Sequence, residues 1–371
     1  MEKRVLVLSN CPVVEYQGSG YVIVNTAKAL ERLDYQVDII TPSSFSFFSF
    51  IEPRALFYRV LIGMTLWVFK NRKSLKDYDF VIFYGSESSL AIFTIRNILG
   101  SKVPIVLHSN GIEEHVNYQL SRFSKYLDIK NKWYHLKRSI INKYCYKSVD
   151  KIITVSKYDS DFLIDHLKVP AYRVFYNEPC LPDIFFDGTE SNIYKKNLIT
   201  YCGTWIARKG VRAIEDVIPV ILRKYPEYSF RIIGVGSEFN LEDHFPEDIR
   251  TRIEVFPLVR SKERLIELYM ESSIFLFPSF CESFGLVVAE AMFCKCAVIT
   301  GPTGYSADLV DNEEAIVLQL PDSENVLTAL EKLINSSSLR NRLGELGQRR
   351  SAALRWETYT TKLGEILANY R

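Results

Sequence analysis

The sequence predicts an α/β fold in two halves, each a doubly wound parallel sheet with helices on both faces. Short apolar runs alternate with helix-forming stretches along the chain, in the β-α-β-α order that produces parallel sheets. The run Ile274-Phe275-Leu276-Phe277 contains no polar residue, as expected of a strand that is buried on both faces. With 371 residues, the chain is long enough for two domains, each with its own core.

The first half opens with a strand, a glycine-containing loop and an amphipathic helix. The strand is expected at residues 4–10, the loop ends at Gly18-Ser19-Gly20, and the helix runs to about Leu33. Because the loop lacks a Walker lysine and a full GxGxxG pattern, its glycines alone are weak evidence for a phosphate site. Further strands are expected at residues 36–41, 79–84, 104–108, 151–156 and 173–177.

Two segments of the first half have an unusual composition. Phe45–Phe69 is rich in aromatic and aliphatic residues, but it is too short and too interrupted by Arg59 to span a bilayer. It fits either a buried helix or an element at a lipid interface. Between His115 and Lys151, nine Lys or Arg residues stand against two Asp residues. Such a segment fits an anionic membrane surface or a solvated helix face equally well.

The second half repeats the pattern after an irregular linker at residues 181–196, which has little periodicity. Strands are expected at residues 198–203, 231–236, 252–256 and 274–277. Helices are expected from about Gly210 to Lys224 and over residues 261–271, and further helices in the tail end with one from Trp356 to Tyr370.

The stretch after residue 277 carries the strongest indication of function. Pro278 ends the strand, and a helix is expected from about Gly285, where the first turn presents free N–H groups to an anion. Glu290 is a lone carboxylate on this apolar helix, which is costly unless a polar partner meets it, and Glu282 precedes it in the loop. Since carboxylates accept hydrogen bonds from vicinal diols, the two acids suit a phosphorylated, polyhydroxylated ligand. Acids that complement the helix dipole are the alternative.

A cluster of positive charge follows the strand at residues 198–203. Arg208 and Lys209 stand at the start of the next helix, just past the carboxyl end of the strand. Two adjacent cations in this position favour a bound diphosphate. Ordinary surface cations are the alternative.

The composition excludes several classes of protein. A formal net charge of +2 argues against a general nucleic-acid binder. Seven scattered cysteines without a CxxC pair indicate neither a disulfide framework nor a zinc site. The two Asp-x-Asp sequences, at residues 77–79 and 159–161, fall at a strand start and a helix start, so no metal is expected. No signal peptide is evident before the first strand, which predicts a cytoplasmic protein.

The spacing Glu282-(seven residues)-Glu290, within PSFCESFGLVVAEAM, resembles the E-x7-E signature of retaining glycosyltransferases of family 4, or glycosyl transferases group 1. The resemblance implies the GT-B fold, in which two Rossmann-like domains face each other across a cleft. It also implies that Glu282 contacts the donor sugar and that Glu290 binds the nucleotide ribose. The amides of Phe284, Gly285 and Leu286 are then expected to hold the sugar and the phosphate.

Other segments extend this resemblance. Gly203 and Lys209 match the phosphate-binding strand end of the family, whereas Thr204 replaces the usual Arg, so Arg208 is expected to supply the second charge. The segment VLHSNGIE, which contains His108, resembles the one that touches the donor sugar or the acceptor, with a hydrogen-bonded structural histidine as the alternative. The expected catalytic residues are therefore Glu282, His108, Arg208 and Lys209.

The resemblance also divides the chain. Residues 1–180 are the expected acceptor-binding domain and 181–196 the linker. Residues 197–354 are the expected nucleotide-sugar-binding domain, and 355–371 a closing helix that returns to the first domain. Gly18 and Gly20 resemble the glycine-rich loop that approaches the donor and the acceptor from the first domain.

By resemblance, the protein moves a sugar from a nucleotide-diphosphate donor to a hydroxyl of a glycan or lipid-linked acceptor, with retention of configuration. This activity belongs in the synthesis of cell-surface polysaccharide or glycolipid. We expect no cofactor. For the donor nucleotide, UDP is favoured over GDP only as a prior expectation. We also expect an anionic membrane surface as a partner, at the inner face of the membrane. A GT-B-fold nucleotide-sugar epimerase and a non-catalytic nucleotide-sugar-binding partner are the alternatives.

Overall fold

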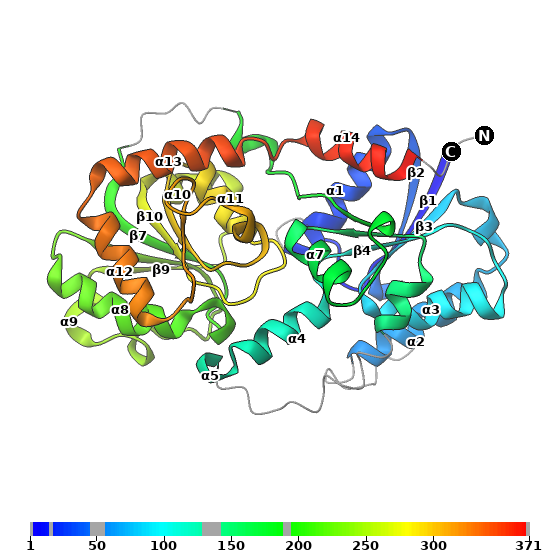
Figure 1. The fold of residues 1–371 in the computed structure, drawn as a ribbon, viewed down its shortest axis with the longest axis horizontal. Coiled ribbons are helices and arrows are strands. Elements are labelled where there is room, and N and C mark those ends of the chain that lie inside the picture. Colours follow the sequence, from blue (N-terminus) through cyan, green and yellow to red (C-terminus); the bar gives the residue numbers. More distant parts are fainter. Residues whose placement is uncertain (1–2, 15–17, 45–55, 128–141, 188–193, 369–371) are drawn as a thin grey trace. The chain divides into compact units, whose positions relative to one another are not determined.

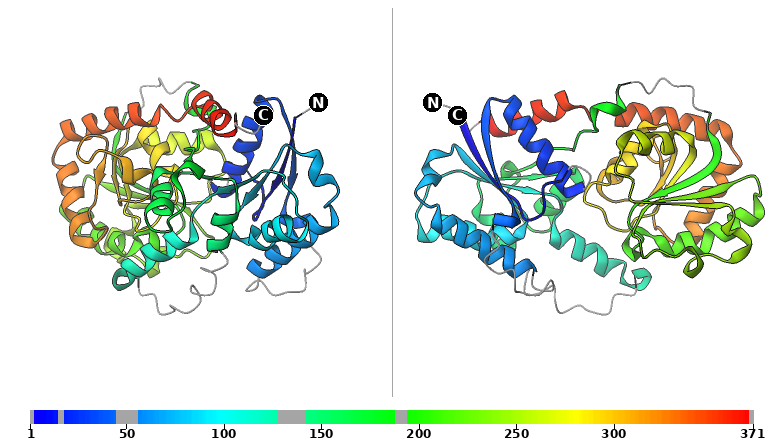
Figure 2. Two further views of the ribbon diagram at one scale, coloured as in Figure 1. Left: turned by 45° about the vertical axis from the view of Figure 1, so that its right-hand side comes forward. Right: turned by 180° about the vertical axis from the view of Figure 1, so that it is seen from behind.

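Two six-stranded parallel sheets organise the chain in the computed structural model, which describes residues 3–14, 18–44, 56–127, 142–187 and 194–368 (Figure 1). Residue contacts divide the chain into two units. Unit 1 comprises Met1–Asn117, Lys130–Cys180 and Trp356–Arg371, and unit 2 comprises Tyr118–Ile129 and Leu181–Arg355. Figure 2 shows helices on both faces of each sheet. These features confirm the predicted α/β fold of two doubly wound sheets.

In unit 1 the strand order is β2-β1-β3-β4-β5-β6, and all neighbouring strands pair in parallel. The strands are β1 (Lys3–Leu8), β2 (Tyr35–Ile40), β3 (Phe80–Tyr84), β4 (Ile105–Ser109), β5 (Lys151–Thr154) and β6 (Val174–Tyr176). Because β2 and β3 lie on opposite sides of β1, the strand order reverses between β1 and β3. Such a topological switch point is where open α/β sheets bind ligands, outside the carboxyl ends of the strands.

Two cores cover the faces of this sheet. On one face lie α1 (Gly18–Arg32) and α14 (Trp356–Leu367), and on the other lie α2 (Leu56–Lys70), α3 (Ser89–Phe93) and α7 (Lys157–Asp165). Residues 142–148 form a further helix of unit 1, and α4 (Glu113–Arg122) begins in unit 1, whereas α5 (Ser124–Leu127) belongs to unit 2. No helix in the described ranges combines the length and the apolar character that are needed to cross a bilayer.

In unit 2 the strand order is β12-β11-β10-β7-β8-β9, again parallel throughout. The strands are β7 (Lys196–Cys202), β8 (Ser229–Val235), β9 (Ile253–Pro257), β10 (Ser272–Phe277), β11 (Ala297–Thr300) and β12 (Ile316–Val317). The helices are α8 (Val211–Lys224), α9 (Glu247–Arg250), α10 (Lys262–Glu271), α11 (Leu286–Phe293), α12 (Ser323–Ile334) and α13 (Ser337–Ser351). Every residue of β10 is buried, as its apolar run predicts.

One segment departs from the predicted domain boundary. The sequence places residues 1–180 together, whereas Tyr118–Ile129 groups with unit 2. The reason is an aromatic cluster, because Phe123 and Leu127 pack with Phe280 from the loop after β10. The rings of Phe123 and Phe280 lie 5.2 Å apart between centroids.

Candidate functional site

The two loops that follow the neighbouring strands β7 and β10 are packed directly against each other. The carbonyl oxygen of Arg208 accepts hydrogen bonds from the Phe280 amide at 2.9 Å and from the Ser279 hydroxyl at 3.1 Å. Gly210 has φ = 76°, and a Cβ atom there would stand 1.9 Å from the carbonyl oxygen of Pro278. Only glycine meets both conditions, so this residue allows the close approach of the two loops.

This packing gathers charge around Glu282. Its Oε1 lies 2.8 Å from the Lys209 Nζ and 3.7 Å from an Arg208 guanidinium nitrogen, and the Ser279 hydroxyl donates to it at 2.9 Å. The Lys209 and Glu282 side chains are only 13% and 12% exposed, whereas Arg208 is 39% exposed. Partial burial strengthens such contacts relative to surface ion pairs. The structure thus brings together three of the four residues that the sequence singles out as catalytic.

The expected donor-binding residues frame the same loops. Gly203 follows β7, and a Cβ atom there would lie 3.4 Å from Cδ of Lys209. Gly285 precedes the first turn of α11, which Leu286 begins, so the amides of residues 284–286 lie at a helix start. The Phe284 carbonyl accepts from the Tyr305 amide at 2.8 Å, which ties this turn to the segment after β11.

Glu290 has a cationic partner that the sequence analysis missed. Its side chain is buried in α11, where Oε1 lies 2.5 Å from Lys262 Nζ and Oε2 accepts from the Tyr269 hydroxyl at 3.4 Å. Burial lowers the pKa of Lys262, but the charge and the hydrogen bond of Glu290 outweigh it and raise that pKa above its ordinary value. The position of Lys262 at a helix start, where the dipole disfavours a cation, indicates from the sequence that Lys262 needs a partner, but it does not indicate which one.

His108 lies in the interior of unit 1. Its ring is fully buried, stacked on Tyr84 at 4.9 Å, with Nε2 3.5 Å from the Thr26 hydroxyl. Burial lowers the pKa of His108 to about 3, so the ring is neutral at physiological pH. In this arrangement the imidazole does not reach solvent, which favours the structural role that the sequence left open.

Gly18 and Gly20 also differ from their expected setting. Both lie in the first turn of α1 rather than in a loop before it. Gly20 is buried, and a Cβ atom there would stand 2.4 Å from the carbonyl oxygen of Val14. Close backbone packing therefore accounts for Gly20, while Gly18 has open space around its Cα atom.

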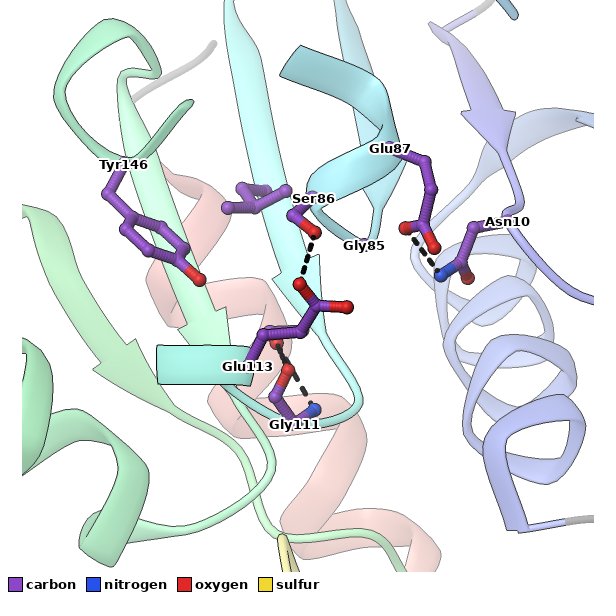
Figure 3. Close-up of a pocket in the computed structure, with 9 residues that line it drawn as sticks. Asn10, Gly85, Ser86, Glu87, Gly111, Glu113 and Tyr146 are labelled. Atoms are coloured by element: carbon purple, nitrogen blue, oxygen red, sulfur yellow. Dashed lines mark hydrogen bonds between the residues drawn. The ribbon is translucent and has the colours of Figure 1, made fainter. Parts of the chain in front are cut away.

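A polar cavity of ≈ 70 Å³ lies at the switch point of the unit 1 sheet (Figure 3). Its walls come from segments that follow β1, β3 and β4 and from two helical segments. The lining residues are Asn10, Gly85, Ser86, Glu87, Leu107, Ser109, Gly111, Glu113 and Tyr146. Neither this cavity nor its acids was identified from the sequence, because the residues are scattered over 137 positions; only the segment around His108 pointed to this edge of the sheet.

The two Asp-x-Asp sequences have structural partners. Asp159 is buried and lies 2.7 Å from Nδ1 of His115, and Asp79 accepts a hydrogen bond from the Arg4 amide at 2.7 Å. Across the part of the chain that the structure describes, no three His, Cys, Asp or Glu side chains come together as a metal site would require.

Comparisons with known proteins account for both units. Residues 186–350 match the family model of glycosyl transferases group 1, and residues 16–177 match that of Glycosyltransferase Family 4. The chain belongs to the group 1 glycosyltransferases.

Individual relatives of this glycosyltransferase are distant. An uncharacterized glycosyltransferase of Methanocaldococcus jannaschii is 25% identical over 342 residues, which is 82% of this chain and 93% of that protein. The capsular polysaccharide biosynthesis glycosyltransferase CapM of Staphylococcus aureus is 28% identical over 166 residues, or 43% of this chain and 44% of CapM. The second match therefore spans less than half of either protein.

Two solved structures share the fold along the whole glycosyltransferase chain. Sucrose-phosphate synthase from Thermosynechococcus elongatus has a TM-score of 0.78 at 14% identity, covering 99% of this chain and 98% of that one. Anabaena HepE in complex with UDP has a TM-score of 0.69 at 13% identity, covering 99% and 100%. At these identities the likeness establishes the GT-B fold alone.

The burial of His108 predicts an acid-dependent loss of stability. In the unfolded chain His108 binds a proton below about pH 6.5, whereas in the folded protein its lowered pKa keeps it neutral down to about pH 3. Proton binding therefore favours the unfolded state progressively as the pH falls below about 6.5, and it has no effect on the free energy of unfolding above that pH. The slope approaches about 1.4 kcal/mol per pH unit. In thermal melts of the glycosyltransferase from pH 7 to pH 4, His108→Phe should lose less stability than wild type. The exposed His166→Phe is the matched control, and parallel pH profiles for His108→Phe and wild type would contradict this origin.

Lys209 is predicted to contribute directly to the affinity for a nucleoside diphosphate. Loss of one charge-assisted hydrogen bond costs about 1.5–3 kcal/mol, so Lys209→Met should weaken UDP binding about 10- to 100-fold in isothermal titration. Arg208→Met should have a smaller effect, because that side chain is more exposed. Lys224→Met, at the far end of α8 and paired with Glu331, is the control that should bind UDP normally. If Lys209→Met and wild type bind UDP with equal affinity, the assignment of Lys209 to the donor site is wrong.

Proposed function

We propose that the protein is a retaining glycosyltransferase that transfers a hexose from a nucleotide-diphosphate donor on unit 2 to a hydroxyl of an acceptor recognised by unit 1. The observation that carries this proposal is the group of Arg208, Lys209 and Glu282 at the carboxyl ends of β7 and β10. Two cations beside a helix start match a diphosphate, and a carboxylate beside them matches the hydroxyls of a sugar.

In the proposed reaction, the bond between the sugar C1 and the diphosphate oxygen breaks while a bond from the acceptor oxygen to C1 forms on the same face. The acceptor proton passes to the departing phosphate oxygen, so the products are the glycoside and the nucleoside diphosphate. Arg208, Lys209 and the amides at the start of α11 stabilise the negative charge that develops on the leaving group. Glu282 orients the donor sugar, and Glu290, held by Lys262, accepts hydrogen bonds from the ribose.

We propose UDP as the nucleotide of the donor and a glycan or lipid-linked sugar as the acceptor. The UDP complex of HepE, which shares the fold, supports the first part. The similarity to CapM, named for capsular polysaccharide biosynthesis, supports a place in the synthesis of cell-surface polysaccharide or glycolipid. Because the chain and CapM match over less than half of their lengths, pathway and acceptor are part of the proposal.

The test of this function is turnover of a nucleotide-sugar panel by the full chain. UDP-glucose, UDP-galactose, UDP-N-acetylglucosamine and GDP-mannose are offered with methyl glycosides, and product anomers are assigned by NMR. We expect release of UDP that depends on acceptor, with an α-linked product from an α-linked donor. Conversion of a nucleotide sugar without acceptor would indicate an epimerase instead. An inverted product would refute retention, and binding without any turnover would indicate a non-catalytic partner.

We also propose that unit 1 contacts an anionic membrane through the outer face of α2. The inner face of this helix is buried, as Met64 and Val68 show, while Tyr58, Ile62, Leu66 and Phe69 are between 37% and 47% exposed at spacings of four, four and three residues. This stripe is apolar and solvent-facing, and Lys70 and Arg72 flank its end. Both predicted settings of Phe45–Phe69 thus fit α2, while residues 45–55 and residues 128–141 of the basic segment lie outside the described residues.

Membrane contact through α2 predicts binding that depends on lipid charge and on exposed apolar side chains. Wild type should sediment with vesicles of phosphatidylglycerol and phosphatidylcholine at low salt and less at high salt. A Leu66→Ser, Phe69→Ser double variant should bind at least tenfold more weakly, since burying each side chain contributes on the order of 1.5 kcal/mol. Val220→Ser, which alters an equally exposed apolar residue on α8, is the control. Failure of wild type to sediment, or sedimentation unchanged in the double variant, would exclude this surface.

A further inference from the structure

The unit 1 cavity stands where the fold favours ligand binding. Asn10 follows β1, and Gly85, Ser86 and Glu87 follow β3, so the cavity opens between the two strands at which the strand order reverses. The backbone is shaped for this opening. Gly85 has φ = 78°, and a Cβ atom there would stand 2.1 Å from the Asn10 amide nitrogen and 2.4 Å from Glu87 Oε2. Any other residue at position 85 would push the walls of the cavity apart or fill it.

The cavity presents mainly oxygen atoms. Ser86 and Ser109 contribute buried hydroxyls, and Glu87 and Glu113 contribute carboxylates from opposite walls (Figure 3). The Asn10 amide donates to Glu87 Oε2 at 3.0 Å, and the Ser86 hydroxyl donates to Glu113 Oε2 at 3.3 Å. The nine lining residues include no Lys, Arg or His. The lining therefore offers acceptors to groups that donate hydrogen bonds, and it contributes no cationic side chain to an anion.

Two residues that contact the lining also carry buried acceptor atoms that lack donors among the described residues. Asn142, which is 1% exposed, donates to Glu113 Oε2 at 3.0 Å, but its own Oδ1 accepts nothing from the described residues. Glu114 accepts from the Tyr146 hydroxyl at 2.6 Å, while its Oε1 is buried and accepts nothing from them either. Buried acceptors without donors are rare in folded proteins, so the side chains that support the lining from behind also carry acceptor atoms in excess of donors.

We propose that this cavity binds one edge of a non-anionic sugar, through two adjacent hydroxyls or a hydroxyl and an amino group, and that it discriminates against phosphorylated sugars. A volume of ≈ 70 Å³ is small beside that of a typical small-molecule pocket, so the cavity suits one edge of a sugar rather than a whole oligosaccharide. Glu87 and Glu113 accept hydrogen bonds from the two groups. The inference rests on the proposed function and deepens it, because it assigns the cavity to the acceptor and fixes the charge class of that acceptor.

The test measures binding of matched sugars to the full chain by saturation-transfer NMR, with saturating UDP added so that phosphates do not compete for Lys209. Glucose, mannose and galactose are each offered as the methyl glycoside, the 2-amino sugar and the 6-phosphate. We expect at least one neutral or amino form to bind tenfold or more tightly than its 6-phosphate. Glu87→Gln and Glu113→Gln should each weaken that binding several-fold and reduce the discrimination against phosphate. Glu31→Gln, an exposed acid on α1, should change neither.

The outcomes separate this inference from the proposed function. If UDP fails to bind, the donor assignment of unit 2 is wrong, while the sugar arm of the experiment still reports on the cavity. If UDP binds but no neutral or amino sugar does, the inference is wrong and the transferase proposal stands. Equal or tighter binding of the 6-phosphates, or binding that is insensitive to both Glu→Gln changes, also overturns the inference. Circular dichroism melts of each variant show that the fold is retained.

Discussion

The proposed donor site depends on one close approach between two loops. Gly210 brings the turn after β7 against the Pro278 carbonyl, and the Arg208 carbonyl is then satisfied by the loop after β10. Lys209 and Glu282 are 73 positions apart in the sequence, and this backbone contact is what holds their side chains within hydrogen-bond distance. A larger residue at position 210 would have to displace backbone rather than a flexible side chain. The local chemistry is thus a consequence of backbone packing at the carboxyl edge of the sheet.

Most strands were predictable because burial on both faces leaves a simple signature. Apolar runs marked the ends of β1 and β10 to within two residues, whereas β12, with two residues, carries no pattern long enough to detect. The charged residues after β7 and β10 were also identifiable, since parallel neighbours end at the same edge. The pairing of Glu290 with Lys262 was not, because it joins two helices whose packing only the folded chain defines.

Unit 1 shows where motif reasoning fails. His108 lies in a segment that suggests ligand contact, but successive side chains of a strand point to opposite faces, and the His108 ring points into the core beneath α1 and α14. Its neighbours Leu107 and Ser109 line the cavity instead. A shift of one residue decides between the two faces of a strand, and sequence alone does not show which face is which. The two acids of the cavity, Glu87 and Glu113, come from the segment after β3 and from the start of α4, so no spacing links them.

The two sheets carry their proposed ligand sites at equivalent places in their topology, but the chemistry of the two places is opposite. In unit 2 the edge after β7 and β10 places two cations around one carboxylate, which suits a ligand with several negative charges. In unit 1 the edge after β1 and β3 has carboxylates and hydroxyls and no cation in its lining, which suits a neutral, hydroxyl-bearing ligand. A transfer reaction between a nucleotide sugar and a neutral sugar is served by two such sites. If both bound anions, the leaving diphosphate would compete with the acceptor, so the charge difference itself helps to keep the two substrates in their own places.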